Sequence, residues 1–226
     1  MLKKYEDLPK ELKNKETKRY YEILSKKRVY LIFKRIFDLI GALILLTLLS
    51  PIFLVLAILI KLDSKGPVFY RQERITKYGK TFRIFKFRTM ITDADKKGNL
   101  LTSKNDSRIT KVGTKIRNSR LDEIPQLLNI ITGDMSFVGT RPEVKKYVNK
   151  YTDEMYATLL LPAGVTSKAS INYKDEAKIL EKYSDKMDED TIYIKKVLPE
   201  KMKYNLEYIE KISFIEDLKT CIKTVI

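Results

Sequence analysis

The chain has 226 residues and a formal net charge of +16, with no His and a single Cys, Cys221. The excess of Lys and Arg favours polyanionic partners such as anionic lipid, nucleic acid or phosphorylated substrates. The lack of His and of a second Cys excludes a disulfide within the chain, Cys/His zinc sites and triads built on imidazole. Catalysis would therefore rely on carboxylates, Lys, Arg, Tyr or hydroxyl groups, with a hard metal such as Mg²⁺ held by oxygen ligands.

The N-terminal residues 1–33 are strongly charged, and their few apolar residues include Tyr20, Tyr21, Ile23 and Leu24. This composition predicts a basic N-terminal arm, helical or partly disordered, that lies on the membrane surface. The arm would lead into the membrane segment that follows it.

Residues 36–60 form an apolar run in which only Asp38, Thr47 and Ser50 are polar. A straight helix of this length reaches about 37 Å, and the hydrocarbon core of a bilayer is about 30 Å thick. One interpretation is a single-pass helix kinked at Pro51, because proline is tolerated in membrane helices. The other is a helix that breaks at Ser50-Pro51 and returns to the same side of the membrane.

Three features favour the second interpretation. Pro51 cannot donate a hydrogen bond to the carbonyl of Thr47, and the Ser50 hydroxyl can bond a carbonyl one turn back. The two halves of the run reach only about 21 and 14 Å, so neither spans a bilayer alone. Both flanks carry Lys and Arg, which places both ends on the cytoplasmic side. We therefore predict a re-entrant membrane helix over residues 34–62.

The rest of the chain mixes strand and helix patterns. Residues 67–90 alternate in part around Tyr78-Gly79, which predicts a β-hairpin. Residues 93–108 and 133–143 are predicted as loops, and residues 116–133 as one helix that ends at Gly133. Overall the sequence predicts an α+β, mostly helical fold, with a cytosolic catalytic domain over 63–195 and C-terminal amphipathic helices over 196–226. A capping box, Ser213 to Glu216, opens the last of these helices.

Asp122 and Glu123 are the most informative pair of carboxylates. They lie near the start of the predicted helix, where Pro125 fits the first turn. One interpretation is structural, because acidic residues at a helix N-terminus offset the macrodipole and cap free N–H groups. The other is catalytic, with the pair holding Mg²⁺ and one carboxylate acting as a nucleophile.

Several basic side chains could bind phosphate near this pair. Arg117 precedes it by five residues, and Arg141 lies in a Gly-flanked loop beyond the helix. Arginine suits a bidentate grip on phosphate oxygens. Lys86 and Arg88 add a basic strand edge. An arginine taken singly is more often a solvated surface charge, and Lys86 and Arg88 could simply form the polar face of one strand.

Seven short segments in order resemble the monotopic phosphoglycosyl transferases, a family of bacterial sugar transferases. The match is close from residue 34 to 142 and looser through "LPAGVTS" (161–167) to the end. The segments are "KRIFD" (34–38), "SP" (50–51), "KLDSKGPVFYRQERI" (61–75), "GKTFRIFKFRTM" (79–90), "DSRITKVGTKIR" (106–117), "LDEIPQLLNI" (121–130) and "GDMSFVGTRP" (133–142).

The resemblance implies a re-entrant helix broken at Ser50-Pro51 and a catalytic domain on the cytoplasmic face of the bacterial inner membrane. It also implies that Asp122 attacks the phosphate of a UDP-sugar, expels UMP and passes the sugar phosphate to polyprenol phosphate. Glu123 would help to hold Mg²⁺ or accept a proton, and Arg117 and Arg141 would bind phosphate. The partners implied are UDP-sugar, polyprenol phosphate and membrane lipid, with no nucleic acid; homo-oligomers are compatible with this scheme.

Two departures from the family pattern bear on substrate selectivity. The usual Gly-Pro-Arg-Pro is Gly139-Thr140-Arg141-Pro142 here, and the usual Pro-Gly-Ile-Thr is Ala163-Gly164-Val165-Thr166. Two other functions remain open at this point: a membrane-anchored basic binding protein without catalysis, and a metal-dependent phosphohydrolase. The dispersed basic residues, with no stacking platform of aromatic residues, argue against nucleic-acid binding.

Overall fold

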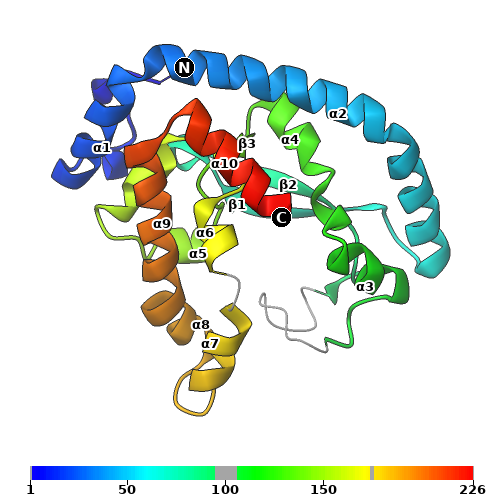
Figure 1. The fold of residues 1–226 in the computed structure, drawn as a ribbon. Coiled ribbons are helices and arrows are strands. Elements are labelled where there is room, and N and C mark those ends of the chain that lie inside the picture. Colours follow the sequence, from blue (N-terminus) through cyan, green and yellow to red (C-terminus); the bar gives the residue numbers. More distant parts are fainter. Residues whose placement is uncertain (1, 95–105, 174–175, 226) are drawn as a thin grey trace.

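A computed structural model of the chain describes residues 2–94, 106–173 and 176–225 (Figure 1). The first half contains α1 (Lys15–Lys26), α2 (Arg28–Asp63), β1 (Phe69–Ile75), β2 (Thr81–Phe87), α3 (Lys111–Asn118) and α4 (Gln126–Thr132). The second half contains β3 (Met135–Val138), α5 (Lys145–Val148), β4 (Ala163–Thr166), α6 (Lys168–Asn172), α7 (Glu176–Tyr183), α8 (Glu189–Ile192), α9 (Leu198–Lys211) and α10 (Phe214–Val225). The predicted class, mostly helical with a few strands, is confirmed.

The apolar run forms part of α2, which begins at Arg28 and contains Pro51 without an interruption. The prediction that Ser50-Pro51 separates two helices is therefore wrong. Figure 1 instead shows one continuous helix that changes direction along its length. The carbonyl of Thr47, which Pro51 leaves without its usual donor, accepts the Ser50 hydroxyl at 2.8 Å. This bond lowers the cost of proline inside an apolar helix.

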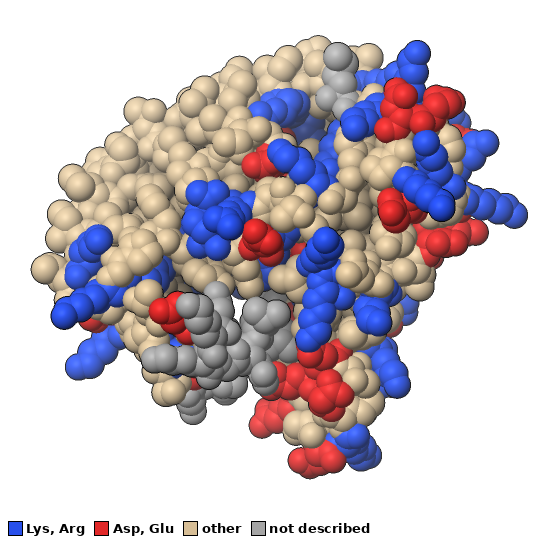
Figure 2. All heavy atoms as spheres, turned by 180° about the vertical axis from the view of Figure 1, so that it is seen from behind, with Lys and Arg blue, Asp and Glu red and all other residues tan. Residues whose placement is uncertain are grey.

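Most of the surface of α2 is apolar and exposed. Among the described residues, α2 is the one helix long and apolar enough to cross a membrane. Leu48, Leu54 and Leu62 are among its most exposed side chains. Figure 2, a view from behind, shows a broad face free of charged side chains at the upper left, whereas Lys and Arg gather elsewhere. Such a large apolar surface is typical of a membrane contact.

Both ends of α2 are tied to the rest of the fold. Near the start, Arg35 donates to the carbonyls of Ile130 and Ile131 at the end of α4, at 2.6 and 3.0 Å. Near the end, Leu56 and Ile60 are buried in a cluster with Phe87 and Ile116, and Ser64 follows the last turn. The two ends of the helix therefore pack on the same globular body.

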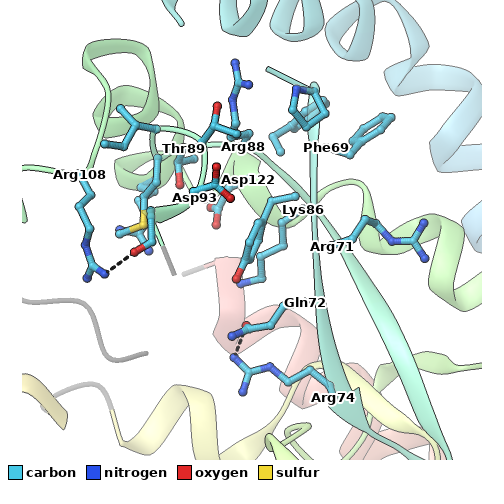
Figure 3. A pocket seen from close by; sticks show the side chains of 18 residues that line it. Phe69, Arg71, Gln72, Arg74, Lys86, Arg88, Thr89, Asp93, Arg108 and Asp122 are labelled. Carbon is cyan, nitrogen blue, oxygen red and sulfur yellow. Dashed lines mark hydrogen bonds between the residues drawn. The ribbon is translucent and has the colours of Figure 1, made fainter. Parts of the chain in front are cut away.

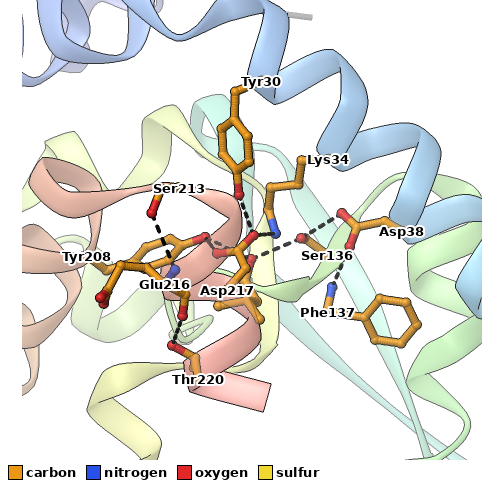
Figure 4. Close-up of polar contacts among 11 residues, drawn as sticks. Tyr30, Lys34, Asp38, Ser136, Phe137, Tyr208, Ser213, Glu216, Asp217 and Thr220 are labelled. Carbon is orange, nitrogen blue, oxygen red and sulfur yellow. Dashed lines mark hydrogen bonds and ion pairs between the residues drawn. The ribbon is translucent and has the colours of Figure 1, made fainter. Parts of the chain in front are cut away.

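Polar contacts fix the first half of α2 against distant segments (Figure 4). Asp38 is buried and accepts hydrogen bonds from the Ser136 hydroxyl at 2.7 Å and the Phe137 N–H at 3.2 Å. Lys34 pairs with Asp217 of α10 at 2.5 Å. The carboxylate of Asp217 also accepts the hydroxyls of Tyr30 and Tyr208, at 2.6 and 2.7 Å. This network joins α2 to β3, α9 and α10.

The N-terminal residues differ from the predicted basic arm. Leu2, Leu8, Leu12 and Leu24 are buried in the core that also contains Tyr208 and Ile209 of α9. The basic side chains of α1 stay on the outer face, and its apolar side packs inward, as expected for an amphipathic helix. Residues 2–27 are thus part of the folded body.

The predicted hairpin is confirmed. Strands β1 and β2 pair antiparallel from Phe69↔Phe87 to Ile75↔Thr81. Tyr78 and Gly79 adopt positive φ of 60° and 74° at the turn between them. The hairpin carries Lys86 near its end and so brings this side chain toward the carboxylates discussed below.

Two other predictions need correction. The single helix expected over 116–133 is divided into α3, a 3₁₀ turn over Leu121–Glu123 and α4, because Arg120 adopts a left-handed φ of 55°. The expected end at Gly133 is confirmed, with φ of 86° at the C-cap.

The loop expected over 133–143 contains β3, which pairs in parallel with β4. Most of the loop predicted over 93–108 lies outside the described residues.

Candidate active site

The two carboxylates of the candidate site lie in the 3₁₀ turn between α3 and α4. Both side chains are partly exposed. Helix α4 begins after Pro125, and its N-cap has no side-chain hydrogen bond. The contacts therefore do not support the interpretation of Asp122 and Glu123 as side-chain caps of α4.

Glu123 is held in its ionised form by neighbouring cations. Its Oε1 accepts Lys86 Nζ of the hairpin at 2.6 Å. Burial alone would raise the pKa of Glu123, but Lys86 and Arg141 outweigh it and lower this pKa to about 2. The carboxylate is therefore a fixed negative charge at neutral pH, and it orients Lys86.

Asp122 shows the opposite shift. Burial raises the pKa of Asp122, and the like charge of Glu123 adds to the effect against the opposing charges of Lys86 and Arg117. A raised pKa means a more basic carboxylate, and a more basic oxygen is a better nucleophile. The adjacent carboxylates thus differ in character because their surroundings differ.

Asp122 lies on the wall of a basic cavity of about 500 Å³ (Figure 3). Lys86 and Arg117, two of the residues predicted to bind phosphate, line the same cavity. The remaining basic lining residues are Arg71, Arg74, Arg88 and Arg108. Such a concentration of cations around one carboxylate suits a ligand with several negative charges.

Arg88 lies at this cavity, but its guanidinium has other partners. It donates to the carbonyls of Ser64 at 2.6 Å, Lys65 at 2.9 Å and Ile60 at 3.2 Å. In Figure 3 the side chain points away from Asp122. Arg88 therefore binds the carbonyl groups at the end of α2. These contacts do not support the predicted role of Arg88 in binding phosphate.

A second cavity, of about 640 Å³, meets the first at Asp122. Glu123 and Arg141 line it, so the predicted Arg141 lies beside the predicted dyad. The Arg141 guanidinium donates to the Ser170 hydroxyl at 3.1 Å. Leu45 and Leu49 of α2 form part of the same wall. One carboxylate therefore faces both a basic cavity and a cavity walled in part by the apolar helix α2.

The donor set at this junction suits Mg²⁺ in one particular way. Among the described residues, no group of three Asp, Glu or Cys side chains is placed to hold a metal. Mg²⁺ is usually held by one or two carboxylates together with substrate phosphates. Asp122 lines both cavities at the junction, and Glu123 would share its charge with Lys86. The residues fit a metal that arrives with a diphosphate.

Several lining residues were not singled out from the sequence. Arg71, Arg74 and Arg108 lie within motifs of the family resemblance, but nothing in their spacing separated them from surface charges. Arg120 has a left-handed backbone that a non-glycine residue seldom adopts outside functional or turn sites. The feature that draws attention to Arg120 is its backbone conformation, which only the structure could reveal.

The chain belongs to the bacterial sugar transferase family, whose pattern matches residues 29–226. It is 34% identical over 160 residues to a UDP-glucose:undecaprenyl-phosphate glucose-1-phosphate transferase of Escherichia coli K12, covering 69% of this chain and 31% of the relative. It is also 34% identical over 135 residues to a UDP-N-acetylgalactosamine-undecaprenyl-phosphate N-acetylgalactosaminephosphotransferase of Aeromonas hydrophila, covering 56% of this chain and 30% of the relative.

A third relative is the uncharacterized sugar transferase EpsL of Bacillus subtilis (strain 168), 43% identical over 104 residues. That match covers 46% of this chain and 50% of the relative. The chain therefore spans half or less of the length of these relatives.

Proposed function

We propose that this protein transfers a sugar-1-phosphate from a UDP-sugar to polyprenol phosphate and releases UMP. The observation that carries the proposal is the position of Asp122, where a basic cavity meets a cavity walled by α2. A diphosphate needs the first environment, and a lipid-linked acceptor needs the second. The relatives are named for transfer of sugar phosphates to undecaprenyl phosphate. We place this reaction at the first membrane step of bacterial glycan assembly.

The proposed route has two displacements at one phosphorus atom. In the first, an Asp122 carboxylate oxygen bonds to the sugar-bearing phosphorus and the bond to the UMP oxygen breaks. In the second, a phosphate oxygen of polyprenol phosphate bonds to that phosphorus and the bond to Asp122 breaks. The products are UMP and polyprenol diphosphosugar, and the Asp122 carboxylate is regenerated.

The neighbouring groups stabilise charge rather than move protons. A Glu123 pKa of about 2 makes this carboxylate a poor base at neutral pH, so we assign it to holding Lys86. Lys86, Arg117 and Arg141 would offset the repulsion among phosphate oxygens. Mg²⁺, bound through Asp122, Glu123 and the substrate diphosphate, would supply further charge neutralisation.

We also propose that α2 is re-entrant, with the catalytic body on the cytoplasmic face of the inner membrane. The support is that both ends of α2 pack on one body, through Arg35 and α4 at one end and Arg88 with Ile60 at the other. A single crossing would place these ends on opposite sides of a core of about 30 Å. The exposed Phe214 and Leu218 of α10 would extend the lipid contact, since Phe214 packs against Phe37 of α2.

The nucleophile is tested by Asp122→Asn, with Asp134→Asn as a control outside both cavities. Because the Asp122 pKa is raised, ionised Asp122 disfavours the folded state, and Asn should leave stability unchanged or slightly higher. Exchange of labelled UMP into UDP-sugar without acceptor should occur in wild type and in Asp134→Asn, and fall to background in Asp122→Asn.

Two results would contradict this proposal. Exchange that survives in Asp122→Asn would place the nucleophile elsewhere. Exchange that is missing in a wild type active toward polyprenol phosphate would show direct transfer without a covalent intermediate.

A further inference from the structure

The lining of the cavity beside α2 combines two kinds of side chain. The charged ones are Arg120, Asp122, Glu123, Arg141 and Glu176. The apolar ones are Leu45, Leu49, Ile124, Leu127, Phe137 and Val165, and all of these but Leu45 belong to one packed apolar cluster. A ligand that matches both kinds of lining has an anionic head and a hydrocarbon tail.

The apolar lining adjoins the exposed surface of α2. Leu45 and Leu49 are four residues apart and lie on one face of the helix. Leu45 is 38% exposed, and the neighbouring Leu48 is 68% exposed but is not part of the cavity lining. The cavity wall therefore shares Leu45 with the exposed apolar surface of α2, where a hydrocarbon tail would lie.

The geometry of the two displacements constrains where the ligands lie. An in-line displacement needs the attacking and leaving oxygens on opposite sides of the phosphorus. The acceptor phosphate must therefore occupy the place that the UMP phosphate left, so both substrates share one phosphate position at Asp122. The two substrates differ in the group attached to this phosphate, which is a nucleoside in the donor and a prenyl chain in the acceptor. Two cavities that share Asp122 in their linings are present to hold these two groups.

We infer that the cavity beside α2 binds the first isoprene units of polyprenol phosphate, while the nucleotide of the donor occupies the basic cavity. Leu45, Leu49 and Val165 contact the prenyl chain and determine the selection of a lipid acceptor. This inference rests on the proposed function and adds to it the residues that distinguish acceptor from donor.

The test compares Leu45→Gln and Leu49→Gln with Leu48→Gln on the same helix. A polar amide in place of a buried Leu contact should raise the KM for polyprenol phosphate about tenfold in the first two variants. The KM for UDP-sugar should not rise with it. Leu48→Gln makes the same chemical change on the same helix outside the cavity, so both its KM values should stay within about twofold of wild type.

A second measurement does not depend on turnover. A short prenyl phosphate with a photoreactive group on its first isoprene unit is cross-linked to the Asp122→Asn protein, and the labelled peptides are identified by mass spectrometry. We expect labelling at residues 45–49 or 163–166 that excess polyprenol phosphate suppresses; excess UMP should suppress it as well, because its phosphate occupies the same position.

Equal acceptor KM values in the Leu45, Leu48 and Leu49 variants would overturn the inference, as would labelling confined to the basic cavity. Donor and acceptor KM values that rise together in Leu49→Gln would also overturn it. These outcomes can be distinguished from those of the nucleophile test, because they report on binding of the prenyl chain, whereas UMP exchange reports on the covalent step. A wild type that transfers nothing to polyprenol phosphate would overturn the proposed function and this inference together.

Discussion

Replacing Arg88 distinguishes two possible roles of this side chain, stabilisation of the end of α2 and binding of substrate phosphate. Its guanidinium donates to three carbonyls around the end of α2, two of them within 2.9 Å, and the residue is 5% exposed. Hydrogen bonds that involve a charged group contribute about 1.5–3 kcal/mol each. Two such bonds at the low end of that range predict that Arg88→Met lowers the free energy of unfolding by about 3 kcal/mol. For a chain of this size the shift in Tm would be roughly 6–12 °C.

The assay is thermal unfolding in detergent micelles, together with the KM for UDP-sugar. Arg88→Lys should recover less than half of the lost stability, because one ammonium group cannot reach all three carbonyls. Arg83→Met is the matched control, since the Arg83 side chain is 64% exposed and lies 3.4 Å from Glu73. It should change stability by less than about 0.5 kcal/mol. An unchanged Tm in Arg88→Met with a tenfold rise in the UDP-sugar KM would refute this reasoning and support direct phosphate binding.

Two further predictions concern topology and pH. Single cysteines at Val29, which is 67% exposed, and at Lys65, in a Cys221→Ser background, should both react with an impermeant thiol reagent only from the cytoplasmic side. Labelling of one of them from the opposite side would mean that α2 crosses the membrane. The guanidinium of Arg108 lowers the pKa of Asp106 from 3.8 to about 2, so this pair stabilises the fold above about pH 4 and the effect is lost as pH falls toward 2. In urea unfolding between pH 2 and 7, Asp106→Asn should lose that part of the pH dependence, whereas identical pH profiles would show that the pair contributes nothing.

Short-range signals in the sequence were sufficient for several elements. Tyr78-Gly79 marked the hairpin turn, Gly133 marked the end of α4, and the Ser213 hydroxyl accepts the Glu216 N–H at 3.3 Å as the capping box predicted. These features depend on neighbours within a few residues, so the chain itself carries them. The apolar run likewise indicated a long apolar helix, because its length and composition are local properties.

The partners of charged residues could not be predicted in this way. Lys34 and Arg35 lie one turn from Asp38 in the sequence, but Asp38 accepts hydrogen bonds from Ser136 and Phe137, which are distant in sequence. Lys34 instead pairs with Asp217. A charged side chain takes the partner that the fold brings near in a partly buried position, and periodicity does not contain this information.

The sequence by itself determined the family resemblance, the apolar helix, the hairpin and the identity of the carboxylate pair, because each is written in contiguous residues. Only the tertiary structure decided that Arg88 caps α2 and that the N-terminal leucines complete the core. It also brought Asp122 between two cavities whose walls come from α2, the hairpin, α3 and β4. Burial and like charge then raise the pKa of Asp122 while Lys86 and Arg141 lower that of Glu123, a difference that arises from packing between segments far apart in the chain.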